Sequence, residues 1–162
     1  MTMQSNEVSS TEQQLVVFDL GTESFGVDIS TVREIIRMQE VTAMPNTPEY
    51  VDGVINLRGK VIPVVDLRKR FQMEATEHNK DTRIVVVDVG NHDIGVTVDA
   101  VSEVLRVPMD SIGGHEGVAA IHSSEFLIGI AKMDDRLILL LDLARMLAQV
   151  GATDGEMAEA AV

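Results

Sequence analysis

The sequence predicts a mainly β protein in which a duplicated chain forms two small barrels with short helices. Valine and isoleucine, which pack well on pleated sheets and lose rotamer freedom in helices, occur 23 and 12 times among 162 residues. Apolar residues make up 45% of the chain, which is enough to bury a core, although aromatic residues contribute only 3%. Many short apolar runs separated by turn residues are typical of small barrels.

An internal repeat is the second observation behind this prediction. The segment Val16–Arg37 aligns without gaps with Val85–Arg106, 69 residues later, and nine of the 22 pairs are identical. The run Val61–Leu67 (VIPVVDL) aligns with Leu137–Leu143 (LILLLDL) at an offset of 76. We therefore expect two similar halves that share a core, because a unit of about 65 residues is only marginally stable alone.

Each half begins with two apolar runs joined by a short turn that contains glycine, a pattern that predicts a β-hairpin. The segment that follows fits either one helical turn or a strand, and a second hairpin comes next. The expected first hairpins are Leu15–Leu20 with Phe25–Ile29 and Ile84–Val89 with Ile94–Val98; the segments that fit either structure are Val32–Arg37 and Val101–Arg106; the second hairpins are Val54–Leu57 with Val61–Val65 and Leu127–Met133 with Leu137–Leu141.

Short helices are expected after the second hairpins. Asp66 and Asp142 end these hairpins, where a carboxylate is well placed to cap the start of a helix. The helices themselves are predicted at Leu67–Phe71 and Leu143–Gln149. Pro63 has no amide proton, so its strand is expected to lie at a sheet edge or to contain a bulge there.

The organisation along the chain predicts one domain at residues 14–150, with halves at 14–80 and 81–150. Residues 1–13 and 151–162 are polar, acidic or alanine-rich without periodicity, so they are expected to be disordered tails. The first residues lack the basic and apolar regions of a signal peptide, and no apolar run approaches about 18 residues. Together with the absence of cysteine, these features favour a cytoplasmic location.

Composition excludes several classes of function. The formal net charge of −13 repels phosphate backbones and anionic lipid, so neither nucleic-acid binding nor direct membrane insertion is expected. No cysteine is present to bind a metal or to act as a nucleophile. His115 and His122 could in principle share a metal, but two ordinary loop histidines are the simpler interpretation.

Other catalytic signatures in the sequence are weak. Paired carboxylates are explained by the repeat, the adjacent serines lack the glycine context and base of a nucleophile, and the clustered glycines precede no Walker-type lysine. We therefore expect no enzyme activity, no catalytic residue, no metal site and no cofactor. The residues considered were Asp19, Asp88, Asp66, Asp142, Ser123, Ser124, Gly113, Gly114 and Gly117.

Residues at predicted turns are stronger candidates for function. Arg58 is expected at a hairpin tip, where rigid strands present a side chain and where a guanidinium can hold a carboxylate through two parallel hydrogen bonds. The second half carries Asp134-Asp135 where the first carries Arg58-Gly59. The two tips are therefore expected to have separate tasks, and only one of them can act through an arginine.

Two further groups of charged residues leave alternatives open. Glu34 and its repeat Glu103 could each contact a partner or pair with an arginine of their own half. The run Arg68–Arg70 lies close to Arg58 and Lys60 in an otherwise acidic chain. It fits an ordinary solvated helix face and a functional patch about equally well.

At these residues the sequence resembles the CheW-like domain family of chemotaxis coupling proteins. The resemblance covers nearly the whole chain apart from the tails, and its most specific part is the combination NTP…GVINLRG…VIPVVDLR. The matching segments are VREIIR (Val32–Arg37), VTAMPNTPEYVDGVINLRGKVIPVVDLRKRF (Val41–Phe71), VVVDVGNHDIGVTVDAVSEVL (Val85–Leu105) and FLIGIAKMDDRLILLLDLARML (Phe126–Leu147).

The resemblance implies two intertwined, SH3-like, five-stranded β-barrels and a non-enzymatic adaptor in chemotaxis signal transduction, a two-component system. Members bridge chemoreceptors to the histidine kinase CheA at membrane receptor arrays, so the implied partners are the receptor's cytoplasmic tip and the kinase's regulatory domain. The receptor helix would lie in an apolar groove between the barrels, with polar edges. The residues that carry over as receptor-binding are Val32, Glu34, Ile35, Ile55, Leu57, Arg58, Val98, Val101 and Val104.

The resemblance assigns no kinase-binding residues, because Gly113 and Val118 stand where some relatives carry an arginine and an aromatic residue. The kinase is expected to dock through the barrel ends. An alternative is a CheW-like adaptor of a gliding, twitching or regulatory kinase pathway. A small-molecule sensor that uses an inter-barrel cavity is a weaker alternative, because no convergent set of polar groups in the sequence supports it.

Overall fold

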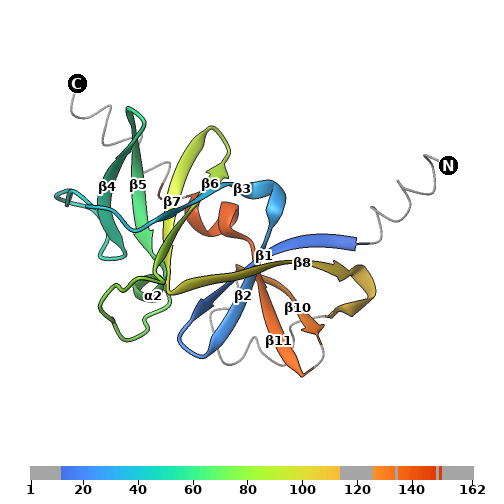
Figure 1. The fold of residues 1–162 in the computed structure, drawn as a ribbon. Coiled ribbons are helices and arrows are strands. Elements are labelled where there is room, and N and C mark those ends of the chain that lie inside the picture. The colour runs from blue at the N-terminus through green and yellow to red at the C-terminus, as the bar shows by residue number, and fades with distance from the viewer. Residues whose placement is uncertain (1–11, 114–125, 134, 149, 151–162) are drawn as a thin grey trace.

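The computed structural model describes residues 12–113, 126–133, 135–148 and 150, and these form a mainly β structure with two sheets (Figure 1). Among these residues, no helix is long and apolar enough to span a bilayer. The strands are β1 (Glu12–Leu20), β2 (Glu23–Asp28), β3 (Val32–Arg37), β4 (Val51–Leu57), β5 (Lys60–Asp66), β6 (Arg83–Val89), β7 (His92–Val98), β8 (Ala100–Pro108), β9 (Ile112–Gly113), β10 (Leu127–Met133) and β11 (Arg136–Leu141). The short helices are η1 (Ile29–Thr31), α2 (Leu67–Arg70), η2 (Met109–Ser111) and one that begins at residue 143.

The two halves of the chain exchange hairpins, so each sheet contains strands from both halves. The six-stranded sheet, barrel A, has the order β8-β1-β2-β11-β10-β9, and the five-stranded sheet, barrel B, has the order β3-β6-β7-β5-β4. Parallel pairing places β2 beside β11 and β7 beside β5. The expected intertwined pair of barrels is therefore confirmed. Barrel A has a sixth strand because the chain after β8 forms the short helix η2 and then becomes extended again as β9.

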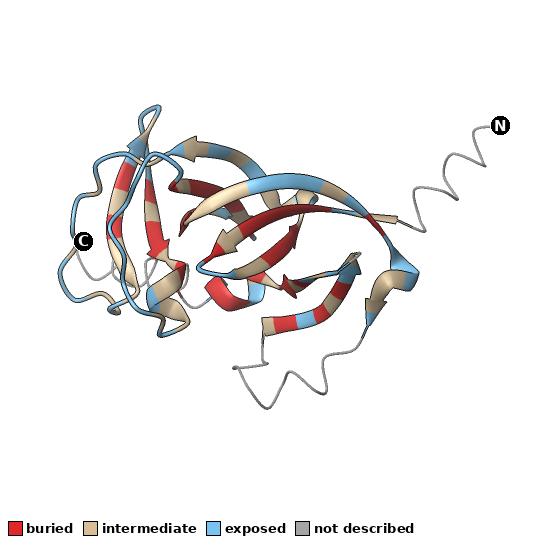
Figure 2. Cartoon of the chain, turned by 60° about the horizontal axis from the view of Figure 1, so that its bottom comes forward, coloured by how far each residue is buried: buried red, intermediate tan, exposed pale blue. Residues whose placement is uncertain are grey.

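Side-chain alternation along the strands produces three apolar clusters. One fills barrel A, and a second fills barrel B. The third and largest takes residues from the outer faces of both sheets and is the inter-barrel core. On β1, Leu15 and Val17 join the cluster inside barrel A, whereas Val16 and Phe18 join the inter-barrel core. Figure 2 shows that buried residues concentrate on the strands, while the connecting loops are largely exposed.

Both predicted helix caps are present. Asp66 accepts hydrogen bonds from the backbone amides of Arg68 and Lys69, and Asp142 accepts one from the amide of Arg145. These bonds satisfy amide groups that have no partner within the helix. The helices that follow bury leucine and methionine side chains in the inter-barrel core.

The two segments that fitted either a helical turn or a strand are the strands β3 and β8. Strand β1 begins at Glu12, before the predicted domain boundary, because its first residues pair with the end of β8. Strand β5 lies between β4 and β7, so of the two alternatives expected at Pro63 the edge strand is wrong, while a register irregularity of the β4–β5 pair lies close by, between Val51 and Gly53 on β4. Pro63 is tolerated because pairing with β7 begins only at Val64. The remaining parts of the predicted tails, 1–11 and 151–162, lie outside the described residues.

Gly53 allows barrel B to close. The chain after β3 returns to β4 through a bridge between Thr42 and Val54, with backbone hydrogen bonds of 2.8 and 2.9 Å. Gly53 has a φ of +148°, and a Cβ at this position would lie 2.0 Å from the carbonyl oxygen of Thr42. Its repeat counterpart Gly129 lies beside β9, which closes barrel A, but less tightly, since a Cβ there would lie 3.2 Å from the carbonyl oxygen of Gly113.

Gly53→Ala is therefore expected to lower the free energy of unfolding by about 3 kcal/mol or more, since the backbone must shift while the residue keeps an unfavourable φ. Gly113→Ala is the matched control, because no atom lies within 4 Å of the added Cβ. Its expected effect is within about 0.5 kcal/mol. Urea unfolding measures both, and equal stability of the two variants would contradict the role of Gly53.

Candidate functional site

The tip of the β4–β5 hairpin is a two-residue turn that presents Arg58 to solvent. Arg58 and Gly59 both have positive φ, 53° and 84°, as a turn that matches the twist of a hairpin requires. The side chain of Asn56 accepts a hydrogen bond from the amide of Gly59 at 2.9 Å. The side chain of Arg58 is 69% exposed, which confirms the expected position of this residue at a hairpin tip.

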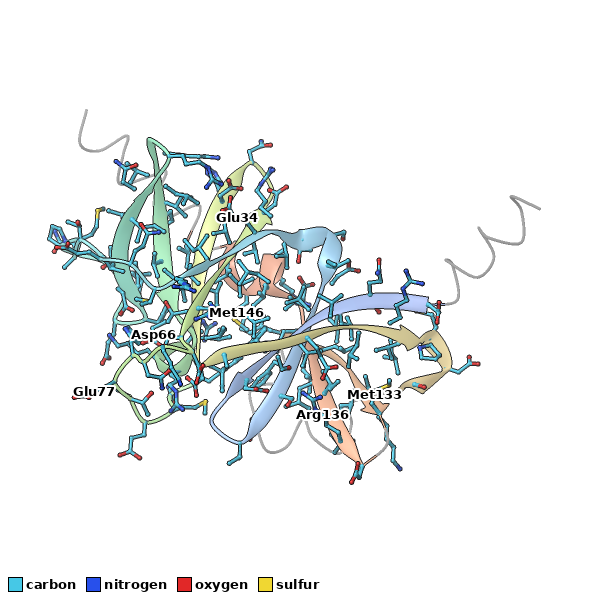
Figure 3. All side chains as sticks on the ribbon, viewed as in Figure 1. Glu34, Asp66, Glu77, Met133, Arg136 and Met146 are labelled. Atoms are coloured by element: carbon cyan, nitrogen blue, oxygen red, sulfur yellow. The ribbon has the colours of Figure 1, made fainter. Side chains whose placement is uncertain are left out.

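Arg58 forms an ion pair with Glu34 on β3, in which Nη2 of the arginine donates to Oε2 of the glutamate. Figure 3 shows Glu34 at the end of barrel B where this hairpin tip lies. Pairing within its own half was one of the two roles expected for Glu34, and the structure shows it. An exposed ion pair of this kind contributes about 1 kcal/mol or less, so a carboxylate from another molecule can compete for the guanidinium.

Four more charged residues lie at this end of barrel B. Asp93 on β7 accepts hydrogen bonds from Lys60 at 2.9 Å and from Arg33 at 2.6 Å, and Arg33 also contacts Asp88 at 3.3 Å. Burial alone would raise the pKa of Asp93, but the hydrogen bonds and positive charges of Lys60 and Arg33 outweigh it and lower that pKa below its usual value. Together with the Arg58–Glu34 pair, these residues are called the charged end of barrel B.

The corresponding end of barrel A carries a simpler cluster. Arg136 on β11 pairs with Glu103 on β8 at 2.6 Å, and Glu103 is the repeat counterpart of Glu34. The second terminal nitrogen of Arg136 donates to the hydroxyl groups of Ser24 and Ser102 at 3.3 and 3.4 Å. Figure 3 shows Arg136 on the β10–β11 side of the molecule. Barrel A therefore keeps an ion pair at the equivalent place. Ser24 and Ser102 stand at the positions that the charged residues Asp93 and Arg33 occupy in barrel B.

Arg58 at its hairpin tip distinguishes barrel B from barrel A. The equivalent tip of barrel A is Asp134-Asp135, which carries the opposite charge. Asp135 is exposed, and Asp134 lies outside the described residues. Glu34 pairs with the tip of the hairpin in its own half, whereas Glu103 pairs with the first residue of β11. The two barrel ends consequently present different charge patterns on the same scaffold.

Apolar side chains are exposed at two pairs of repeat-related positions. Ile35 on β3 and Val61 on β5 are 39% and 65% exposed, and their counterparts Val104 and Leu137 are 51% and 56% exposed. Each of the four is next in sequence to a charged residue of its barrel end. Ile35 and Val104 were predicted from the sequence as receptor-binding residues, whereas Val61 and Leu137 were not, although their shared offset of 76 was a usable signal.

The other residues expected to bind a receptor are less accessible. Val32, Leu57 and Val101 are half-buried and pack against the apolar clusters. Ile55 and Val98 are only 2% and 1% exposed and belong to the core of barrel B and to the inter-barrel core. The expectation that these two line a groove is corrected, because strand alternation turns them inward, where they support the exposed residues.

The basic run after β5 is used within the chain. Arg68 donates two hydrogen bonds to Asp99, at 2.8 and 2.5 Å, and Asp99 also accepts one from the amide of Gly21 at 2.7 Å. The hydrogen bonds from Arg68 are the main reason that the pKa of Asp99 is lowered below its usual value. This pair connects α2 to the β1–β2 turn of barrel A.

The other two residues of this run also have partners. Lys69 pairs with Asp52 at 2.8 Å. The guanidinium of Arg70 lies over the rings of Tyr50 and Phe126, 5.3 and 5.0 Å from their centroids, and so contacts both halves of the chain. The run is therefore structural rather than a free basic patch.

The described residues contain no recognisable reactive centre. Within these ranges, no three histidine or acidic side chains are placed to hold a metal. Asp66 and Asp142 act as helix caps, Asp19 accepts a hydrogen bond from Ser24, and Asp88 belongs to the charged end. Several residues named in the sequence analysis lie outside the described ranges: Gly114, His115, Gly117, Val118, His122, Ser123 and Ser124.

Comparison with known proteins gives one family. A family model described as "CheW-like domain" matches residues 14–151. The chemotaxis proteins CheW of Klebsiella aerogenes and Rhizobium meliloti are 34% and 36% identical to this chain; the alignments cover 84% and 88% of it and 82% and 92% of those proteins. The crystal structure of the scaffolding protein TtCheW from Thermoanaerobacter tengcongensis matches with a TM-score of 0.75 and 42% identity, over 80% of this chain and 88% of that one.

Asp93→Asn is expected to reduce stability at neutral pH by about 1 to 2 kcal/mol, since it removes the charge that Lys60 and Arg33 bind. The pKa of Asp93 is lower in the folded state than in the unfolded chain. The stabilisation is therefore present above the unfolded pKa and is lost as the pH falls through the folded pKa. Urea unfolding at neutral pH and at about pH 3 should show the difference shrinking in acid.

Asp135→Asn provides the control, because this aspartate is exposed. It should change stability little at either pH. A deficit in Asp93→Asn that persists undiminished in acid would contradict the assigned ion pairs.

Proposed function

Because this chain belongs to the family of CheW-like domains, we propose that it fulfils its role as an adaptor of chemotaxis signalling by bridging chemoreceptors to the histidine kinase CheA. The adaptor role accords with the scaffold named in the related structure and with the lack of a recognisable reactive centre among the described residues. The proposed function requires no cofactor. The relatives named chemotaxis protein CheW support this role better than the alternative of a non-flagellar kinase pathway, at which protein FrzA of Myxococcus xanthus hints with 30% identity over 84% of this chain.

The observation that carries the receptor assignment is the charged end of barrel B. Arg58 stands at a rigid hairpin tip in a weak ion pair, and Ile35 and Val61 provide exposed apolar surface on strands of the same barrel. A helix that docks in a groove needs apolar contacts together with polar contacts at the edges. We infer that the cytoplasmic tip of the receptor binds here, and that a receptor carboxylate replaces Glu34 as the partner of Arg58.

The remaining receptor-facing residues take two roles in this proposal. Val32, Leu57, Val101 and Val104 contribute accessible or half-buried apolar surface. Ile55 and Val98 contribute by holding β4 and β7 in place, since their side chains are buried.

The kinase is proposed to dock at another barrel end through its regulatory domain. A cytoplasmic adaptor of this kind would be recruited to membrane receptor arrays through its two partners rather than by inserting into the bilayer. The different charges at the two hairpin tips support separate docking sites, because a surface that suits one partner then disfavours the other.

Arg58→Glu and Ile35→Asp are each expected to weaken binding to a receptor cytoplasmic fragment by about tenfold or more, because one reverses the tip charge and the other places a charge on the apolar surface. A pull-down or calorimetric titration measures the affinity. Asp135→Lys and Ile128→Asp on the β10–β11 hairpin of barrel A are the controls, because both residues are exposed and neither is assigned to the receptor surface, and these variants should bind normally. Unchanged affinity in both test variants, with folding verified by circular dichroism, would refute the receptor site.

Kinase activity in a mixture of receptor, CheA and this chain tests the adaptor role itself. Omission of the chain should remove the control of CheA by the receptor. Arg58→Glu should behave like omission if receptor contact is the lost step. Full receptor control without this chain would contradict the proposed function.

A further inference from the structure

Barrel B has a second end, which opens into a cavity of about 190 Å³. Thr97 lines this cavity and lies on the same face of β7 as Asp93, so the two residues mark opposite ends of the barrel interior. Thr97 is paired with Asp66 at the end of β5. Figure 3 shows Asp66 and Glu77 at the end of barrel B that is remote from Glu34. The connection between α2 and β6 supplies the outer wall, so the cavity is the mouth of a small barrel.

The hydroxyl group of Thr97 has no hydrogen-bond partner in the described structure. This residue is 4% exposed, and its Oγ1 is one of two buried side-chain atoms without a partner among the described residues. Thr82, which also lines the cavity and is 5% exposed, differs because its Oγ1 accepts a hydrogen bond from the amide of Asn79 at 2.9 Å. An unpaired buried hydroxyl is unfavourable, so its place beside a cavity indicates that a bound molecule supplies the missing hydrogen bond.

The charges around the cavity favour a cation. The positive charge of Arg68 is neutralised by Asp99, and another of its nitrogens donates to the carbonyl oxygen of Glu74 at 2.7 Å. Asp66 uses one carboxylate oxygen for the helix cap, and Glu77 has no hydrogen bond or ion pair within the described structure. His78 lines the cavity as well. The free carboxylate oxygens of Asp66 and Glu77 and the hydroxyl group of Thr97 are mainly hydrogen-bond acceptors. The two carboxylates also give the cavity an excess of negative charge.

We propose that the mouth of barrel B binds a small organic cation, such as an alkylammonium or alkylguanidinium ion. Its N–H groups would donate to Thr97 and to the carboxylates of Asp66 and Glu77. Barrel mouths are recurrent ligand sites, and a volume below the roughly 300 Å³ of drug-sized pockets restricts the ligand to a few carbon atoms. The described residues provide no cluster suited to a metal ion. This site is separate from the charged end, so a test of cation binding here does not depend on the adaptor role.

Titration of the full chain with ethylammonium and ethylguanidinium chloride, followed by nuclear magnetic resonance, tests the proposal. Both cations should cause saturable shifts in the amide signals of residues 76–82 and 97–99. Sodium propionate tests an anion of similar size, and sodium chloride controls for ionic strength. Neither should give saturable shifts there.

Variants separate this site from general charge attraction. Thr97→Val preserves shape and removes the hydroxyl, so it should weaken cation binding about tenfold while leaving thermal stability unchanged or higher. Glu77→Gln should weaken binding as well, whereas Glu74→Gln removes a nearby charge outside the cavity and should not. The proposal is overturned if the cations give only linear shifts, which would mean that the cavity holds water alone, if propionate binds equally well, or if Thr97→Val binds like the unaltered chain.

Discussion

The inter-barrel core is the constraint on which the rest of the structure depends. Because the halves exchange hairpins, neither half closes a barrel with its own strands, and both sheets must bury their outer faces against each other. The rings of Phe18, Phe25 and Phe71 stack through this core, with centroid distances of 5.8 and 5.5 Å. The Arg68–Asp99 pair adds two hydrogen bonds between α2 and the turn that follows β7. The barrel ends are therefore held in a fixed relation, which is what a bridging protein needs.

The duplicated scaffold explains how one small chain offers different surfaces. Strands, closing glycines and helix caps recur in both halves, since they are needed for folding. The hairpin tips are free of that requirement and have diverged, with Arg58 on one tip and aspartates on the other. The ion pairs of Glu34 and Glu103 show the same division, because the strand position is kept while the arginine comes from a different place. The two barrel ends thus differ mainly in the charge of their hairpin tips.

Much of this architecture could be predicted from the sequence because it depends on local patterns. Apolar alternation gave the strands, the repeat gave the two halves, and Asp66 and Asp142 gave the helix starts. Hairpin exchange could not be found in this way, because alternation does not reveal which strands become neighbours. The inward orientation of Ile55 and Val98 was missed for the same reason, since the exposed face of a strand depends on the sheet that covers it. Long-range pairs such as Arg68–Asp99 have no local signal at all.

Native-state hydrogen exchange tests most directly whether the exchanged hairpins make one cooperative unit. The slowest amides of β1, β2 and β11 in barrel A and those of β5, β6 and β7 in barrel B should open with the same free energy, equal to that of global unfolding. Increasing urea should affect both sets alike. Separate opening free energies for the two barrels, with one losing protection while the other remains folded, would contradict the shared core and the rigid adaptor built on it.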